Sequence, residues 1–350
     1  MKISIVFWGF PLSPAGGYKV LFEYANELVK KGANIALYFC YSDSNRIKRF
    51  PLVIKKIVAF LFIDVLGIRW YELDPKIELH SVSVINDESI ADADIVIATQ
   101  VETSKDVLQL KDSKGKKYYF IQGYENWNVS EVQLKESYSF MKNIVVSEWL
   151  RKEIELYSSY PIYCVPNGIN SLCFFDRQIH RKRHSVVFHY RSDPNKGAVN
   201  AFEILKLLKN QYSDLTVSMI SSENVEFSLP DYITCYRNLS QEKVAFINNQ
   251  SEVFLCTSIQ EGFGLPGLEA MACGCAVVST NYAGGMEYLV DGENALLADV
   301  GDVKKLVNHI ITIFEDKELR DRLVSSGRKT AQERNIKESV DKLVSILKNE

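Results

Sequence analysis

Short apolar runs alternate with helical patterns along the first half of the chain. The first run, KISIVFW (2–8), precedes an apolar period of 3.6 residues over 18–31, and Gly32 then ends the predicted helix. Further strand-like runs are ANIALYFC (33–40), IELHSV (77–82), ADIVIAT (93–99), KYYFIQ (117–122) and NIVVS (143–147). Strands that are apolar at nearly every position are typical of parallel sheets covered by helices on both faces. The pattern predicts a doubly wound α/β unit.

A second series of the same kind starts after YCVPNGI (163–169). Residues 176–184 are polar, basic and aperiodic, which favours an exposed linker. The expected elements are SVVFHY (185–190), a helix at 197–212, LTVSMI (215–220), ITCYRN (233–238), a helix at 241–249, SEVFLCTS (251–258) and CAVVST (275–280).

The C-terminal stretch 302–349 has a helical pattern throughout, with a break expected near Gly327. We therefore expect two Rossmann-like domains, residues 1–170 and 171–330, that face a central cleft. A helix at about 331–350 is expected to pack back on the first domain. Ligands of open α/β sheets bind where strands end, so chemistry is sought in the loops after strands.

Composition excludes several classes of protein. The net charge is −3, whereas a dedicated nucleic-acid binder usually carries a basic excess. A hydrophobic content of 47% and a charged content of 24% suit a folded globular protein. No run reaches the roughly 18 apolar residues of a membrane span, and no signal-peptide cleavage pattern follows the start. Seven scattered cysteines favour a reducing cytoplasm over a disulfide framework.

The most informative stretch is EGFGLPGLEAMACGCAVVST (261–280), which follows an apolar strand. Gly262 and Gly264 permit a tight turn, Pro266 suits the start of a helix, and Gly274 ends that helix. A Gly-rich loop that runs into a helix N-terminus is an anion site, above all for phosphate. We expect the N–H groups of Gly264 and Leu265 to meet that anion.

Two carboxylates flank this turn: Glu261 on the loop, and Glu269 in the expected first turn of the helix. A carboxylate accepts two hydrogen bonds from neighbouring hydroxyls of a ribose or sugar ring. For Glu269, an acid that is simply well placed at a helix N-terminus is the alternative.

These residues resemble the Glu-x7-Glu motif of retaining glycosyltransferases of family 4, which have the two-domain GT-B fold. GGMEYLVDGENALLADVGD (284–302) and VPNGI (165–169) are also similar to that family. The resemblance implies that Gly262, Phe263, Gly264, Leu265 and Glu269 bind a nucleotide-sugar donor, and that Glu261 hydrogen-bonds its sugar.

A basic pair in HYRSDPNKGA (189–198) supports this interpretation. Arg191 and Lys196 follow a strand, on either side of a turn with Pro194, and can converge on one point. The alternative is a pair of solvated surface cations. In the family, a basic pair at this place grips the donor diphosphate, so Arg191 and Lys196 are expected to be catalytic together with Glu261.

Two post-strand loops of the first half complete the expected site. WGFPLSPAGG (8–17) is no dinucleotide fingerprint, but the resemblance implies that Gly16 and Gly17 lie near the donor phosphates. YFIQGYENW (119–127) lacks the His that relatives often place against the donor sugar; Gln122 or Glu125 is the expected substitute, and a loop residue satisfied by backbone is the alternative.

No metal site is expected. Asp92 and Asp94 form an Asp-x-Asp pair, but the pair precedes its strand, which is the wrong edge of the sheet for a metal–diphosphate site. Without another acidic cluster, we expect a metal-independent mechanism and no cofactor beyond the nucleotide sugar as co-substrate.

The segment RIKRFPLVIKKIVAFLFIDVLGIRW (46–70) interleaves apolar residues with six basic residues and one acid, Asp64. A basic, apolar helix too short to span is typical of an interfacial helix on an anionic membrane. A buried helix pair with snorkelling cations is the alternative.

Together these features predict a metal-independent, retaining hexosyl- or deoxyhexosyltransferase of cell-surface polysaccharide synthesis. It would be cytoplasmic and peripheral on the plasma membrane, with a nucleotide sugar as donor, a lipid-linked saccharide as acceptor and no nucleic-acid partner. A sugar-nucleotide epimerase or phosphorylase of the same fold and a non-catalytic partner subunit are the alternatives.

Overall fold

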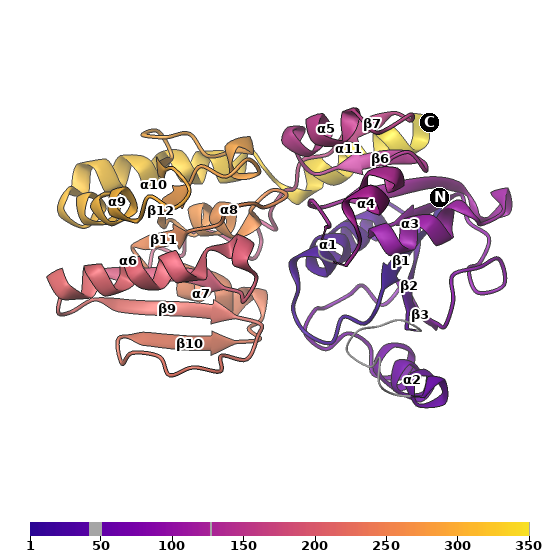
Figure 1. Ribbon diagram of the computed structural model, residues 1–350, viewed down its shortest axis with the longest axis horizontal. Helices are drawn as coiled ribbons and strands as arrows, with labels where there is room; N and C mark the ends of the chain where they lie inside the picture. The colour runs from indigo at the N-terminus through magenta and orange to yellow at the C-terminus, as the bar shows by residue number, and fades with distance from the viewer. Residues whose placement is uncertain (42–50, 127, 350) are drawn as a thin grey trace. The chain divides into compact units, whose positions relative to one another are not determined.

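The computed structural model describes residues 1–41, 51–126 and 128–349, and they divide into two units, each built on one parallel sheet. The first unit contains Met1–Pro166 together with the chain from Lys337 onward, and the second contains Asn167–Ile336. The division falls within a few residues of the boundaries expected from the sequence (Figure 1).

The first unit has a seven-stranded sheet in the order β3-β2-β1-β4-β5-β6-β7. Its strands are β1 (Lys2–Trp8), β2 (Asn34–Cys40), β3 (Glu78–Val82), β4 (Ile95–Ala98), β5 (Lys116–Ile121), β6 (Lys142–Val145) and β7 (Ile162–Cys164). Its helices are α1 (Gly16–Lys30), α2 (Leu52–Ala59), a π-helical turn at Phe60–Val65, α3 (Val101–Leu108), α4 (Glu131–Ser137), α5 (Glu148–Glu155) and α11 (Ile336–Asn349). Central strands such as β4 and β5 are buried on both faces, as their continuous apolar runs predict.

The second unit has a six-stranded sheet in the order β10-β9-β8-β11-β12-β13. Its strands are β8 (Ser185–Tyr190), β9 (Thr216–Ser221), β10 (Ile233–Arg237), β11 (Val253–Cys256), β12 (Ala276–Thr280) and β13 (Ala295–Ala298). Its helices are α6 (Ala198–Gln211), α7 (Gln241–Gln250), α8 (Leu265–Ala272), α9 (Val303–Glu315) and α10 (Lys317–Gln332). Apolar side chains of α6 and α9 pack on β8, β9 and β11 to form its core.

All recorded strand pairs in both sheets are parallel, so the predicted class of two doubly wound α/β domains is confirmed. The strand order reverses between β1 and β4 in the first sheet and between β8 and β11 in the second. Ligands of this fold bind at the carboxyl ends of the strands beside such a reversal. The opposition of the two sheets across a cleft stays a prediction.

The C-terminal helices break elsewhere than expected. The breaks fall at Asp316 and between Gln332 and Ile336, not near Gly327. Asp316 caps α10 by accepting a hydrogen bond from the Leu319 N–H at 2.9 Å. Gly327 is buried within α10, where a Cβ would lie 3.2 Å from Met271 Cγ of α8. This glycine therefore serves helix packing instead of helix termination.

Residues 176–184 are not the exposed linker that their polarity suggested, because they belong to the second unit. The guanidinium of Arg181 donates to the carbonyls of Asn248 (3.1 Å), Ser251 (2.9 Å) and Cys273 (2.6 Å). It also lies 3.4 Å from Asp176, whose other oxygen accepts from Arg328 at 2.7 Å. Arg181 thereby donates to carbonyls at the C-terminal ends of α7 and α8, where backbone N–H donors run out. The Asn248 carbonyl also accepts from the Ser251 N–H at 3.1 Å.

We expect Arg181→Met to lower the free energy of unfolding of the second unit by about 2–4 kcal/mol, because three buried carbonyls lose a charged donor. Urea unfolding followed by circular dichroism measures this loss. Arg183→Met is the matched control, because Arg183 is exposed; it should change stability by less than about 0.5 kcal/mol. Equal effects of the two substitutions would contradict the assignment.

Candidate functional site

The second sheet carries its candidate residues in the two loops that follow β8 and β11, the strands beside the reversal. Arg191 and Lys196 come after β8, and Glu261 comes after β11. Because neighbouring parallel strands end at the same edge, these loops meet there. The topology thus places the predicted residues where this fold binds ligands.

Lys196 and Glu261 form the centre of this edge. The Lys196 ammonium lies 3.4 Å from Glu261 Oε1, and the two side chains are 29% and 17% exposed. The same carboxylate oxygen accepts a hydrogen bond from the Ser258 hydroxyl at 2.6 Å. Two residues that the sequence singled out independently are therefore in contact, and both remain partly open to solvent.

The backbones of the two loops pack directly on each other. Gly197 has φ 63°, and a Cβ at this position would lie 2.0 Å from the carbonyl oxygen of Thr257. The Thr257 hydroxyl donates to the Lys196 carbonyl at 3.1 Å, and the Ile259 N–H donates to the Asn195 carbonyl at 2.7 Å. Glycine is required here both for its positive φ and for the close approach.

Arg191 has its own carboxylate partner, which sequence reasoning missed. Its guanidinium lies 3.4 Å from Glu223, which follows β9 and also accepts from the Ser192 N–H at 2.7 Å. Burial opposes the charged form of Glu223, but the hydrogen bonds from Ser192 and the charge of Arg191 outweigh it, so the pKa of Glu223 lies below its usual range. The convergence of Arg191 and Lys196 on one point stays a prediction.

The Gly-rich turn leads into α8 as expected, with Gly264 as the N-cap residue at φ 87°. The helix starts at Leu265, earlier than expected, so Glu269 lies in its second turn instead of its first. Glu269 is 4% exposed, and only a small part of it can meet a ligand. The Phe263 side chain is buried against Tyr288, so contact of Phe263 with a donor would come through its backbone.

In the first unit, the loops after β1 and β5 are joined by a hydrogen bond. The Gln122 amide donates to the Gly17 carbonyl at 3.0 Å, and Gly16 and Gly17 form the first residues of α1. The Tyr18 hydroxyl donates to the Trp8 carbonyl at 2.7 Å, which holds this helix start against the end of β1. The structure thus brings Gln122 beside Gly17, which Gly16 precedes in the chain.

Glu125 is buried, which argues against its predicted use as a sugar contact. Its Oε2 accepts from the Tyr119 hydroxyl at 2.8 Å and from the Val101 N–H, at the start of α3, at 3.1 Å. Burial raises the pKa of Glu125 to about 8. Glu125 therefore ties the loop after β5 to the helix that follows β4.

Asp92 and Asp94 serve local structure at the amino edge of the first sheet. Asp92 accepts from the Lys114 ammonium at 2.8 Å, and Asp94 accepts from the Lys2 N–H at 2.7 Å. Hydrogen bonds from Lys114 and Ser113 hold the pKa of Asp92 below its usual range. Within the described ranges, no group of three or more His, Cys, Asp and Glu side chains is placed to hold a metal ion.

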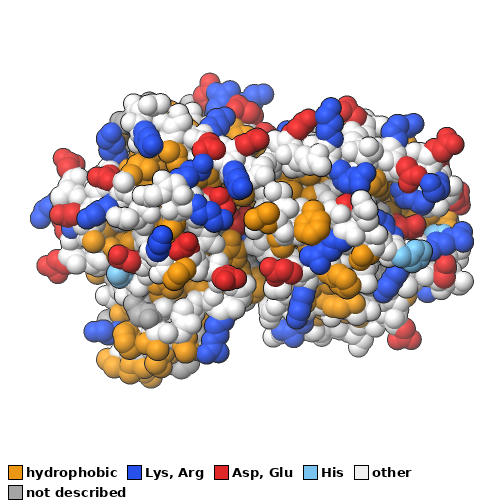
Figure 2. All heavy atoms as spheres, turned by 180° about the vertical axis from the view of Figure 1, so that it is seen from behind, with side chains coloured by type: hydrophobic (Ala, Val, Ile, Leu, Met, Phe, Trp, Pro, Cys, Tyr) orange, Lys and Arg blue, Asp and Glu red, His pale blue; other side chains and the backbone are white. Residues whose placement is uncertain are grey.

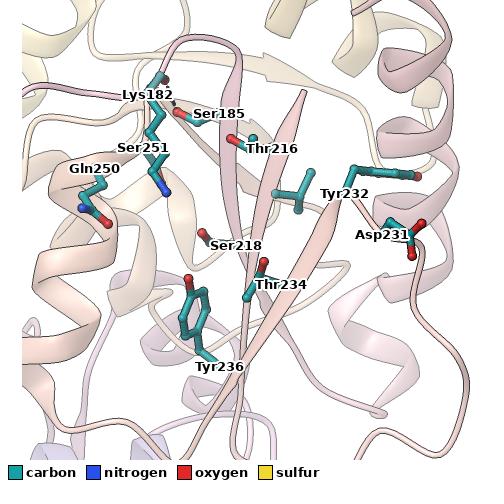
Figure 3. Close-up of a pocket in the computed structure, with 11 residues that line it drawn as sticks. Lys182, Ser185, Thr216, Ser218, Asp231, Tyr232, Thr234, Tyr236, Gln250 and Ser251 are labelled. Atoms are coloured by element: carbon teal, nitrogen blue, oxygen red, sulfur yellow. Dashed lines mark hydrogen bonds between the residues drawn. The ribbon is translucent and has the colours of Figure 1, made fainter. Parts of the chain in front are cut away.

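A polar cavity of about 140 Å³ lies elsewhere on the second unit (Figure 3). Its lining comes from Lys182, Ser185, Thr216, Val217, Ser218, Asp231, Tyr232, Thr234, Tyr236, Gln250 and Ser251. Ser185 and Thr216 begin β8 and β9, so the cavity sits toward the amino ends of the strands. Lys196 and Glu261 follow the carboxyl ends, and the cavity is therefore separate from them.

The segment 46–70 was expected to be an amphipathic helix; 46–50 lie outside the described residues, and the rest forms α2 and the π-helical turn. Seven of its large apolar side chains are exposed, while Ile63 is buried. The seven, which we call the α2 surface, are Val53, Ile54, Ile57, Phe60, Leu61, Val65 and Leu66. Lys55, in contrast, is buried, and Lys56 is exposed. Figure 2 shows apolar side chains gathered at this end of the first unit. Lys55, Ala59 and Ile63 of the same segment are buried, so the segment packs on the unit along one side. The choice between the membrane-facing and the buried-helix interpretation stays a prediction.

Comparisons with known proteins assign the second unit to a family. Residues 173–330 match the family model described as glycosyl transferases group 1. That stretch covers the Lys196–Glu261 pair, the Gly-rich turn and α8. The second unit belongs to the glycosyl transferases group 1.

A curated relative matches part of the chain. The capsular polysaccharide biosynthesis glycosyltransferase CapM of Staphylococcus aureus is 26% identical over 147 residues, 39% of this chain and 38% of CapM. The chain thus spans about two fifths of that relative's length.

Two solved structures match nearly the whole chain. A sucrose-phosphate synthase from Thermosynechococcus elongatus has a TM-score of 0.78 at 15% identity and covers 99% of this chain and 98% of its own. HepE of Anabaena, solved with UDP and glucose, has a TM-score of 0.73 at 14% identity and covers both chains fully, at 100%. These likenesses establish the GT-B fold for the chain. Within the described residues, none of its helices combines the length and the apolar character that crossing a bilayer requires.

We expect Glu125→Gln to remove a pH dependence of stability. The pKa of Glu125 is about 8 in the folded protein against an ordinary 4.5, so between these pH values the folded state holds the extra proton. The stabilisation that protonated Glu125 contributes is complete below pH 4.5 and is lost as pH rises toward about 8. The loss is about 1.4 kcal/mol per pH unit. Glutamine keeps an acceptor oxygen but cannot titrate.

Urea unfolding of both proteins at several pH values between the two pKa values checks this expectation. The advantage of Glu125→Gln over the wild type should grow as pH rises. Glu136→Gln is the matched control, because Glu136 is an exposed glutamate of α4. A constant difference between Glu125→Gln and the wild type would show that Glu125 does not titrate in this range.

Proposed function

We propose that this glycosyltransferase moves a hexosyl or deoxyhexosyl group from a nucleotide-diphosphate donor to a saccharide hydroxyl, with retention and without a metal ion. The observation that supports it best is the Lys196–Glu261 contact at the carboxyl edge of the second sheet. It joins a cation suited to a diphosphate with a carboxylate suited to sugar hydroxyls. The N-terminus of α8 follows on the same loop.

The chemical task is to stabilise a diphosphate that gains negative charge as the glycosidic bond breaks. Lys196, Arg191 and the N–H groups of Gly264 and Leu265 would meet that charge, and Glu261 would orient the sugar ring. Preorganised donors of this kind act without reorganising during the reaction, and the loss of one typically costs about 10²–10³ in rate. Glu269 would accept hydrogen bonds from the ribose with its small exposed part. Retention is compatible with a covalent intermediate or with attack from the same face.

Several resemblances support the class of substrate. HepE was solved with UDP and glucose, and CapM is described as an enzyme of capsular polysaccharide biosynthesis. UDP is therefore the first nucleotide to test, and a saccharide of a cell-surface polymer is the proposed acceptor. No cofactor beyond the nucleotide sugar is proposed.

The acceptor is proposed to be lipid-linked and presented at the inner face of the plasma membrane. The α2 surface is apolar, and the sequence around it carries six basic residues against one acid, which suits an anionic bilayer. Just after this surface, the Trp70 indole donates to the Pro11 carbonyl at 2.6 Å. Pro11 lies in the loop after β1, so the membrane-facing segment is anchored to a loop of the proposed acceptor domain, residues 1–170.

We expect Lys196→Ala and Glu269→Ala to weaken UDP binding, by about 10- to 100-fold for Lys196→Ala, because a charged donor to the diphosphate is lost. Calorimetric titration measures the affinity, after a thermal-shift comparison of nucleotide sugars. Lys206→Ala, an exposed lysine of α6, is the control and should bind as the wild type does. Unchanged affinity in both site variants would rule out the proposed donor site.

We expect Lys56→Glu to weaken sedimentation with vesicles of phosphatidylcholine and phosphatidylglycerol by roughly 10- to 30-fold. A cation near an anionic surface contributes about 1 kcal/mol, and charge reversal changes the charge by two units. Phe60→Ser should weaken binding as well, through lost apolar burial. Lys55 is unsuitable for this test, since it is buried. Val132→Ser, an exposed apolar residue of α4, is the control. If Lys56→Glu and Phe60→Ser bind these vesicles as the wild type does, the α2 surface is no membrane contact.

A further inference from the structure

Two buried tyrosines lie beneath the Gly-rich turn. They are the first and last residues of the segment Tyr282–Tyr288, which follows β12 and which we call the base loop. The Tyr288 hydroxyl donates to the Gly264 carbonyl at 2.6 Å, and the Tyr282 and Tyr288 hydroxyls are 3.4 Å apart. Both side chains are almost fully buried, at 2% and 3% exposure. Burial raises the pKa of each phenol, so both hydroxyls keep their protons.

The base loop fits the turn so closely that only glycine is possible at the points of contact. A Cβ at Gly264 would lie 2.0 Å from the Tyr282 hydroxyl, and one at Gly267 would lie 2.4 Å from the Tyr288 hydroxyl. On the other side of the loop, a Cβ at Gly284 would lie 2.3 Å from the Glu261 carbonyl oxygen. The base loop thus supports the motif at both of its ends.

The hydrogen bond from Tyr288 fixes more than one atom. The peptide group between Gly264 and Leu265 is planar and trans, so its C=O and its N–H point in opposite directions. The same carbonyl also accepts from the Gly267 N–H at 3.2 Å, so the shorter hydrogen bond from Tyr288 adds to a restraint that the first turn of α8 already places on this peptide. Because Tyr288 holds the carbonyl inward, the N–H of Leu265 points outward, away from the buried phenol.

We propose that Tyr288, oriented by Tyr282, is a positioning residue that aims the N–H groups at the start of α8 toward the diphosphate of the donor. This inference rests on the proposed function, because it assigns that site its diphosphate. Tyr288 itself does not touch the donor and acts through the Gly264–Leu265 peptide. Its loss should therefore change recognition of the diphosphate and leave recognition of the nucleoside intact.

The test compares the affinities of the full chain for UDP and for uridine, measured by calorimetric titration, in the wild type and in Tyr288→Phe. We expect Tyr288→Phe to bind UDP about 3- to 10-fold more weakly, the effect of one lost hydrogen bond, while uridine affinity stays within about twofold. Partial unfolding would weaken both ligands by the same factor, so the ratio of the affinities separates positioning from stability. Tyr212→Phe is the control, because its hydroxyl donates to Glu315 at 2.9 Å on another part of the unit.

The outcomes are distinguishable. A lower ratio of UDP to uridine affinity in Tyr288→Phe, but not in Tyr212→Phe, supports the inference. An unchanged ratio, with UDP still bound by the wild type, overturns the inference alone. If the wild type prefers another nucleoside diphosphate, that nucleotide and its nucleoside replace UDP and uridine in the comparison. If the wild type binds no nucleoside diphosphate, the proposed function fails, and the role assigned to Tyr288 fails with it.

Discussion

The carboxyl edge of the second sheet depends on backbone packed against backbone without side chains between. The loop after β8 lies on the loop after β11 at Gly197, and the base loop lies on the same segment at Gly284. Added methyl groups at these points would meet carbonyl oxygens at 2.0 and 2.3 Å, far inside any tolerable contact. This contact fixes where Lys196 and Glu261 project, so the charges of the site depend on glycines that carry no chemistry themselves.

The two cations of this edge are each paired within the chain, Lys196 with Glu261 and Arg191 with Glu223. Half-exposed pairs contribute little to stability, so breaking one costs little. On the proposed function, the diphosphate of an arriving donor would replace Glu261 as the partner of Lys196, because the diphosphate carries more negative charge. Glu261 would then be free to accept hydrogen bonds from the sugar, while Ser258 keeps one of its oxygens in place.

The sequence was sufficient for the regular elements and for the loops that carry the candidate site. Continuous apolar runs identify central strands such as β1 and β8, but the edge strands β7 and β13 were not predicted. β7 has only three residues, whereas β13 is a four-residue apolar run as long as β4 and was within reach of the sequence. Polarity misled at Arg181, whose partners are carbonyls that no sequence pattern reveals. Glu223 also follows a strand, and a search of every post-strand loop would have found it. Tyr288 could not be found this way, because its role lies in one contact with a backbone carbonyl.

The α2 surface combines exposed apolar side chains with a buried lysine. A helix on a water-facing surface normally buries its apolar stripe and exposes its lysines. Here Lys55 is 7% exposed, whereas Val53 is 69% and Phe60 is 56% exposed. Scattered exposed apolar residues are ordinary, but a contiguous set on one short helix is not. On the proposed function, an apolar environment with an anionic surface would cover these side chains, and the neighbouring basic residues suit such a surface.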